Sequence, residues 1–418
     1  MILNLVRQRG IVLLMVCLSV MSYFDRIIMS TAGLFIMREY KLTETQMGTI
    51  YSAFLFSYAL LMIPGGRLAD RAGPRRVLTV MSLGAALFTA LTALGGKPLF
   101  GIWLGVLPSF VAIRLALGVL TAPLYPACAI LNARWVSREH RARTWGWVAC
   151  GSGIGGALAP LLFSWMIDHY GWRFSFAVSG AVTGLFGVLW FLWVRDFPEG
   201  DNPRVASEAR TPTPWRALFT NRDLMLLTTS YVATNYFEYI FFYWLFYYFG
   251  NIRHAGNRES AIYSAIIWTA WTLMTPTGGW ISDRLVGRFG RQKGRKLMPI
   301  FSLTLAAVLL AVAINVTATT PMIVMLFVTL GLAAATDGPY WVSASDLGGS
   351  HVGAAGGILN TGGNIGGFLA PVLTPLLASR LGWSSALYAG SFILLVGAVL
   401  WFFIDVTNTV ASREPASG

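Results

Sequence analysis

Long apolar stretches alternate with short polar or Gly/Pro-rich breaks along the whole sequence. Each stretch is about 20 to 25 residues long, the length that an α-helix needs to cross a bilayer. We predict twelve such helices, which start near Ile11, Gly48, Arg76, Gly101, Thr144, Arg173, Asp223, Glu259, Leu297, Pro321, His351 and Trp383. The pattern therefore indicates an all-α membrane protein with no room for a soluble domain.

The longest polar break lies near the middle of the chain. It spans residues 196–222, contains four prolines and separates six predicted helices from the other six. Proline-rich segments of this kind act as extended spacers. We therefore expect an N-terminal six-helix bundle at residues 1–195, a cytoplasmic linker at 196–222 and a C-terminal six-helix bundle at 223–418.

Three short motifs of the first half recur in the second half. The pairs are Gly66-Arg-Leu-Ala-Asp70-Arg71 with Gly279-Trp-Ile-Ser-Asp283-Arg284, Gly155-Gly156-Ala-Leu-Ala-Pro160 with Gly366-Gly367-Phe-Leu-Ala-Pro371, and Gly171-Trp172 with Gly382-Trp383. Their offsets of 213, 211 and 211 residues keep one register, which unrelated membrane helices rarely do. We infer two pseudo-symmetric halves, and parallel repeats of this kind are expected to bind substrate at their interface.

Charged residues are few and unevenly placed. Only 12% of the residues are charged, and the formal net charge is +13. Of the 31 Lys and Arg residues, 22 fall before the first predicted helix, in alternate loops or in the tail, whereas 7 fall on the other side. By the positive-inside rule we expect both termini in the cytoplasm and a multi-pass protein of the plasma (inner) membrane. Since topology accounts for the basic charge, the expected partner is the lipid bilayer and not a nucleic acid.

Several charged residues fall inside predicted helices, where each costs about 2.5 to 3.5 kcal/mol. At a rise of 1.5 Å per residue, Asp25, Arg114, Glu238 and Asp337 each lie roughly 20 to 24 Å from the start of their helix, near one plane. Arg26 adjoins Asp25. For any one of these residues, a permanent ion pair that holds two helices together would explain the charge. The common depth of the residues in both halves favours a polar cavity instead.

The types of residue predicted to line that cavity indicate what kind of substrate it binds. The two arginines indicate an anion, because a guanidinium can bind a carboxylate through two parallel hydrogen bonds. Uncharged pairs spaced i, i+4 share a helix face and suit a hydroxyl-rich substrate: Asn235 with Tyr239, and Asn360 with Asn364; Asp337 shares its face with Trp341. Hydrogen bonds between helices explain the asparagines equally well.

Features of enzyme chemistry are missing from the predicted helices. The four histidines fall in loops or at helix ends, and the three cysteines fall in apolar segments, where they pack as small hydrophobic residues. Residues 151–156 satisfy the pattern G-x-G-x-x-G, but no strand precedes them, so we interpret them as a helix-packing surface. We therefore expect no enzyme, no cofactor and no metal site.

The segment from Gly66 to Arg76 resembles the loop signature of the major facilitator superfamily, with a partial copy at Asp283 and Arg284. Three further motifs resemble its anion:cation symporter branch, which includes bacterial sugar-acid transporters, sialin and the vesicular glutamate carriers: Tyr23-Phe-Asp25-Arg26, Arg114, and Asn360-Thr-Gly-Gly-Asn364-Ile-Gly-Gly. The resemblance covers the whole chain. It implies a rocker-switch transporter with a central site and a proton-linked organic anion as substrate.

The resemblance also implies residue roles. Arg26 and Asn364 are expected to contact the substrate, with Tyr23 as a second contact and Asp25 as a proton-binding group. The chain departs from the family at Thr121, where proton-coupled sugar-acid members typically carry a glutamate. A second departure is Thr49 in place of a family tyrosine in helix two, although Tyr51 is close by.

Because of Thr121, proton binding has to fall to Asp25, Glu238 or Asp337. No basic residue lies within 14 positions of Glu238 in the sequence, and a buried carboxyl without a cation nearby holds a proton more readily. We predict proton coupling through Asp25 with Glu238 as the second group.

We also predict a conformational latch in the loop signature and its partial copy. Its charged residues are expected to form ion pairs and contacts with helix ends that stabilise one conformation of the transporter. These residues are Asp70, Arg71, Arg75, Asp283 and Arg284.

The sequence thus predicts a secondary active transporter that moves a small organic anion, a sugar acid or another carboxylate, by alternating access with proton symport, as a monomer. The alternatives are a facilitative or sodium-coupled carrier, or a membrane sensor of the same fold that transports nothing.

Overall fold

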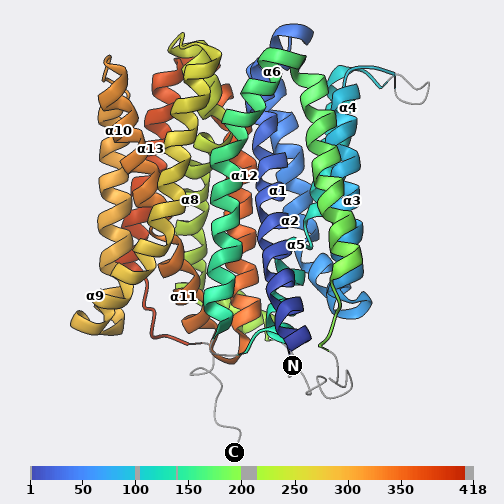
Figure 1. Cartoon of the computed structure of the whole chain (residues 1–418). Helices are drawn as coiled ribbons and strands as arrows, with labels where there is room; N and C mark the ends of the chain where they lie inside the picture. The colour runs from blue at the N-terminus through green and yellow to red at the C-terminus, as the bar shows by residue number, and fades with distance from the viewer. Residues whose placement is uncertain (1, 99–103, 138–139, 199–213, 410–418) are drawn as a thin grey trace, which may run out of the picture. The chain divides into compact units, whose positions relative to one another are not determined.

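Helices make up almost all of the chain that the structure describes (Figure 1). The structure, a computed structural model, describes residues 2–98, 104–137, 140–198 and 214–409, and no strand occurs within these ranges. The all-α prediction is therefore confirmed. Eight helical stretches of this part of the chain are long and apolar enough to cross a bilayer, judged by length and composition. The number of twelve crossings stays a prediction.

In chain order the long helices are α1 (Ile2–Tyr40), α2 (Glu44–Ala72), α3 (Pro74–Leu91), α4 (Val106–Thr121), α5 (Leu124–Trp135), α6 (Arg141–Trp193), α8 (Arg222–Tyr247), α9 (Asn257–Ala313), α10 (Thr319–Ala334), α11 (Asp337–Gly348), α12 (Val352–Leu381) and α13 (Trp383–Phe403). The short helix α7 (Trp215–Thr220) lies within the predicted linker. The fourth predicted helix is divided into α4 and α5 before Leu124, because Pro123 cannot donate the hydrogen bond that would continue α4. The tenth predicted helix is also divided in two, into α10 and α11.

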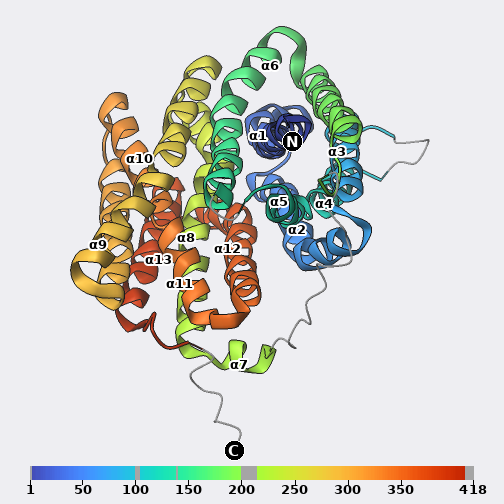
Figure 2. The same ribbon diagram turned by 60° about the horizontal axis from the view of Figure 1, so that its bottom comes forward.

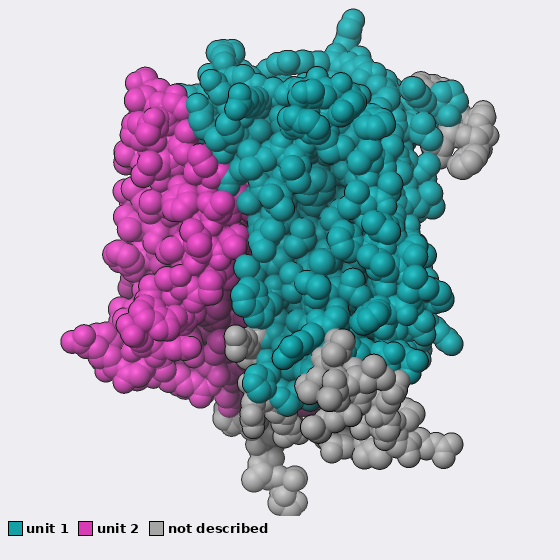
Figure 3. Space-filling view, viewed as in Figure 1, with its two compact units in different colours: residues 1–210, 246–265 teal, residues 211–245, 266–418 magenta. Residues whose placement is uncertain are grey.

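The chain forms two compact units, which Figure 3 distinguishes by colour. Unit 1 comprises Met1–Arg210 and Phe246–Ala265, and unit 2 comprises Thr211–Leu245 and Ile266–Gly418. The segment at 246–265, which contains the end of α8 and the start of α9, belongs to unit 1. Within that unit, Tyr247 donates a hydrogen bond to Glu44, and Asn257 donates one to Asp168.

Two long helices, α6 and α9, are interrupted at a glycine with positive φ. Gly171 in α6 has φ 79° and ψ 159°, and Gly290 in α9 has φ 78° and ψ 166°. α6 turns back on itself part-way along its length, as both ribbon views show (Figures 1 and 2), and Gly171 is where its helical backbone is interrupted. Gly382, the repeat partner of Gly171, has nearly the same backbone angles, with φ 85° and ψ 159°. The repeated Gly-Trp motif therefore marks one kind of turn in both units.

In unit 1, α1 packs against α6 and is neighboured by α3 and α5 (Figure 2). The glycine motif of α6 makes this crossing close: a Cβ on Gly155 would come within 2.2 Å of the backbone oxygen of Val20. In unit 2, a Cβ on Gly366 of α12 would come within 2.1 Å of the backbone oxygen of Val232 in α8. The second repeated motif therefore packs a pair of helices in each unit, as the sequence predicts.

Candidate functional site

Arg26 lies in the middle of α1 among aromatic rings. Its guanidinium carbon is 4.8 Å from the ring centroids of Tyr23, Phe54 and Tyr58, and the residue is 2% exposed. The rings of Phe54 and Tyr58 are stacked with centroids 5.7 Å apart. A cation over aromatic faces is attracted by the ring quadrupoles. The guanidinium is therefore held in place within an apolar surrounding.

Arg114 of α4 reaches the same group of rings. Its guanidinium carbon lies 4.9 Å from the ring centroid of Phe54, and the residue is 1% exposed. The two arginines, from separate helices, therefore share one phenylalanine. We call Arg26, Arg114, Tyr23, Phe54 and Tyr58 the arginine cluster.

Asp25 faces different neighbours from Arg26, although the two are adjacent in sequence. The Thr183 hydroxyl of α6 donates a hydrogen bond of 2.8 Å to Oδ2 of Asp25. Asp25 is 2% exposed, and its charge interacts with that of Arg114. The structure thus brings together four residues that the sequence predicts for the site: Tyr23, Asp25, Arg26 and Arg114.

Sequence reasoning missed the rings that support the arginines. Phe54 and Tyr58 are spaced i, i+4 on α2, the same signal that singled out the asparagine pairs. Tyr125 of α5 was also missed; its hydroxyl is 3.3 Å from the Ser19 hydroxyl, and it lies close enough to Arg26 to interact with its charge. Aromatic residues are frequent in this chain, so spacing alone did not distinguish these three.

A second polar cluster lies in unit 2 and contains two predicted carboxyl groups. The Tyr231 hydroxyl donates a hydrogen bond of 2.9 Å to Oδ1 of Asp337. Glu238 is 4% exposed and interacts with the charge of Asp337. The Tyr340 hydroxyl is 2.6 Å from Ser230 Oγ. Within the described part of unit 2, no basic side chain interacts with either carboxyl.

The predicted asparagines lie where α8 and α12 meet. The amide nitrogen of Asn235 donates to the Tyr231 carbonyl at 3.0 Å, and that of Asn364 donates to the Asn360 carbonyl at 2.9 Å. Both bonds are to the residue four positions earlier on the same helix. A Cβ on Gly363 of α12 would lie 3.1 Å from Cγ of Asn235, so the two helices are close there.

The other two predicted contacts, Tyr239 and Trp341, differ in burial. The Tyr239 ring stacks on Phe242 with centroids 4.6 Å apart, and a Cβ on Gly367 would come within 2.9 Å of it. Trp341 is 38% exposed and packs beside Gly356. Tyr239 is thus part of an aromatic packing surface, whereas Trp341 leaves much of its indole accessible.

The loop signature of unit 1 makes contacts that sequence spacing did not reveal. The backbone N–H of Arg75 donates to Oδ1 of Asp196 at 2.7 Å, and its Nη2 donates to the Phe191 carbonyl at 2.8 Å. Asp70 is exposed and interacts with the charge of Arg134, as does Asp196. Asp196, three residues after the end of α6, therefore accepts a hydrogen bond from the first turn of α3.

The partial copy of the loop signature in unit 2 has other partners. Nη1 of Arg295 lies 3.4 Å from Oδ1 of Asp283, and the guanidinium carbon of Arg284 lies 3.6 Å from the ring centroid of Trp280. In unit 1, Arg71 is exposed. The two copies of the motif thus share their sequence pattern but not their contacts.

Comparison with known families gives one match over most of the chain. The sequence model described as Major Facilitator Superfamily matches residues 14–349 and 285–417. With the apolar helices described above, this match indicates a multi-pass membrane protein.

Curated relatives cover nearly the full length. The chain is 28% identical to a protein named "Probable sulfoacetate transporter" of Cupriavidus necator, over 99% of this chain and 97% of the relative. It is 25% identical to the hexuronate transporter of Bacillus subtilis, over 96% and 94% of the two chains. It is 26% identical to the D-galactonate transporter of Escherichia coli, over 95% and 96%.

Solved structures show the same fold at lower identity. A bacterial homologue of the human lysosomal transporter Spinster, in an inward-facing conformation, superimposes with a TM-score of 0.80 at 16% identity, covering 98% of this chain and 99% of that one. The D-xylose-proton symporter superimposes with a TM-score of 0.74 at 15% identity, covering 96% and 98%.

Proposed function

Because the chain belongs to the Major Facilitator Superfamily, as its loop signature predicts, we propose that it is a secondary carrier of a small organic anion. The substrate is a sugar acid or another carboxylate, and it crosses the membrane by alternating access. The protein works as a monomer in the plasma membrane with both termini in the cytoplasm. Relatives named for sulfoacetate, hexuronate and galactonate transport support the anion class.

The observation that carries this proposal is the arginine cluster. Two buried guanidiniums are costly within a membrane protein, and such residues in membrane helices mark substrate pathways. Asp25 neighbours the cluster and can offset at most one of the two positive charges, so the two arginines favour an anion. Arg26 is the anion anchor, since its planar guanidinium matches a carboxylate. Tyr23, Arg114, Asn235, Tyr239, Trp341, Asn360 and Asn364 complete the proposed substrate contacts.

Proton coupling is the second part of the proposal. Asp25, Glu238 and Asp337 are the proton-binding candidates, and Asp25 and Glu238 are the two that we assign to transport. Both are buried, and each interacts with another charged group of its own unit. The proposed conformational latch consists of Asp70, Arg71, Arg75, Asp283 and Arg284.

Counterflow in proteoliposomes tests the carrier function. Vesicles loaded with an unlabelled sugar acid or sulfocarboxylate should accumulate the labelled compound, because a carrier exchanges substrate without an energy source. Arg26→Ala should lower exchange at least tenfold, whereas Arg76→Ala, which removes an exposed arginine at the start of α3, should leave it unchanged. Exchange that persists at full rate in Arg26→Ala would rule out this anchor. A protein that binds such anions but exchanges none would be a sensor.

A further inference from the structure

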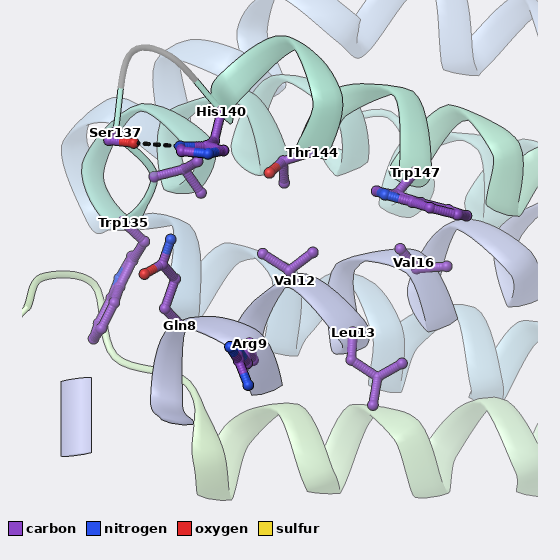
Figure 4. Close-up of a pocket in the computed structure, with 11 residues that line it drawn as sticks. Gln8, Arg9, Val12, Leu13, Val16, Trp135, Ser137, His140, Thr144 and Trp147 are labelled. Carbon is purple, nitrogen blue, oxygen red and sulfur yellow. Dashed lines mark hydrogen bonds between the residues drawn. The ribbon is translucent and has the colours of Figure 1, made fainter. Parts of the chain in front are cut away.

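A groove of about 990 Å³ opens on unit 1 between α1, α5 and α6 (Figure 4). None of its lining residues belongs to the arginine cluster. Gln8, Arg9, Val12, Leu13 and Val16 of α1 form one wall. The other wall consists of residues from the end of α5 to the first turns of α6, namely Trp135, Val136, Ser137, His140, Thr144 and Trp147.

One end of the groove is polar. Arg9 is exposed and forms no hydrogen bond or ion pair with any residue that the structure describes. The His140 ring nitrogen Nδ1 is 2.9 Å from the Ser137 hydroxyl, a contact drawn in Figure 4, and Nε2 is not part of it. A guanidinium and an imidazole nitrogen are thus available to an anionic group at this end.

The other end is apolar. Leu13 is 63% exposed and Trp147 is 56% exposed, which is unusual for side chains of this size unless lipid or a ligand covers them. Val16 lies beside them in the groove. From Arg9 to Val16 and from His140 to Trp147 the chain advances seven residues, about 10 Å of helix. Both walls therefore change from polar to apolar in the same direction, as Figure 4 shows.

A soluble anion would use only the polar end, and an uncharged apolar ligand would use only the other. We propose that the groove binds one anionic phospholipid, with the headgroup phosphate at Arg9 and His140 and the first part of an acyl chain along Leu13, Val16 and Trp147. Arg9 is one of the basic residues that the positive-inside rule assigns to the cytoplasmic surface, where basic pockets beside membrane helices suit anionic headgroups. This site is separate from the proposed transport function.

Native mass spectrometry of the purified full chain in detergent tests the proposal. Phosphatidylglycerol and phosphatidylcholine with identical acyl chains are added in equal amounts, and the fractions of protein carrying one bound lipid are compared. We expect at least a fivefold preference for phosphatidylglycerol, because only its headgroup has a net negative charge. Arg9→Gln should reduce the preference to near one, whereas Arg76→Gln, a surface arginine outside the groove, should keep it.

Two further measurements test whether the apolar part of the groove contributes to binding. Val12→Trp fills the middle of the groove and should lower binding of phosphatidylglycerol, while Val80→Trp, at a position 63% exposed on α3, should not. Soluble glycerol phosphate at millimolar concentration should not displace the lipid, because it gains nothing from the apolar end. Equal binding of both lipids, an unchanged preference in Arg9→Gln, or full displacement by glycerol phosphate would each overturn the proposal, the last in favour of a free-anion site.

Discussion

At the scale of one residue, Phe54 shows how an aromatic ring helps to hold two buried cations. The centroid of its ring lies 4.8 Å from the guanidinium carbon of Arg26 and 4.9 Å from that of Arg114. A desolvated cation–π contact contributes about 2 kcal/mol, which offsets part of the hydration that each arginine loses.

We predict that Phe54→Leu weakens substrate binding about tenfold, which corresponds to about 1.4 kcal/mol, because both arginines lose a ring that orients them. Phe56→Leu is the matched control, since Phe56 is on the same helix but is 50% exposed. Isothermal titration of the purified variants with substrate measures the effect. If both variants bound like the parent protein, Phe54 would have only a packing role.

At the scale of elements, glycines with positive φ decide where helices end. Gly171 and Gly382 occupy the repeated Gly-Trp motif, and a Cβ on either would meet no neighbouring atom within 4 Å. A side chain would therefore fit at either position without a steric clash. Glycine is required by the backbone conformation, because φ near 80° with ψ near 160° is a region that residues with a side chain almost never adopt.

Two alanine substitutions in α6 separate backbone strain from packing. Gly171→Ala should destabilise the protein by about 1 to 3 kcal/mol. Gly146→Ala should be neutral or stabilising by up to about 1 kcal/mol, because Gly146 has helical backbone and its Cβ would also meet nothing. Thermal unfolding in one detergent, followed by fluorescence, gives the comparison. A lower melting temperature for Gly146→Ala than for Gly171→Ala would contradict the assignment of the turn.

At the scale of the whole molecule, the polar clusters of the two units differ in the sign of their charged residues. Unit 1 holds Arg26 and Arg114 with one carboxylate, Asp25, whereas unit 2 holds Glu238 and Asp337 without a basic partner in its own described residues. Two carboxyls that interact rarely ionise together. This division suits a carrier whose anion anchor, Arg26, lies in unit 1 and whose proton-binding groups lie in both units.

The coupling prediction is tested in right-side-out vesicles. Adding substrate should make the external medium more alkaline, because protons enter with the anion. Glu238→Gln should reduce that signal by at least fivefold, and Glu259→Gln, which changes an exposed glutamate at the start of α9, should preserve it. No pH change in the parent protein would point to facilitated diffusion or sodium coupling. A full signal in Glu238→Gln would remove this residue from the mechanism.

The sequence by itself determined the helical class, the duplicated motifs and four of the buried charged residues, Asp25, Arg26, Arg114 and Glu238. These follow from local physics: a run of apolar residues must satisfy its backbone hydrogen bonds within a helix, and a charge inside such a run is costly wherever the helix lies. The positions of Arg26, Arg114 and Asp25 could therefore be named as candidates before any contact was known.

Tertiary structure alone decided which side chains meet. The ring of Phe54 contacts two arginines that are 88 positions apart in sequence, and Asp196 caps a helix that begins 122 positions earlier at Pro74. The groove of unit 1 is assembled from the start of α1, the end of α5 and the start of α6. Helical periodicity gives the face on which a side chain lies but not the helix that covers that face. That choice is made by the packing of all helices together, since small residues such as Gly155 fix which backbones can approach.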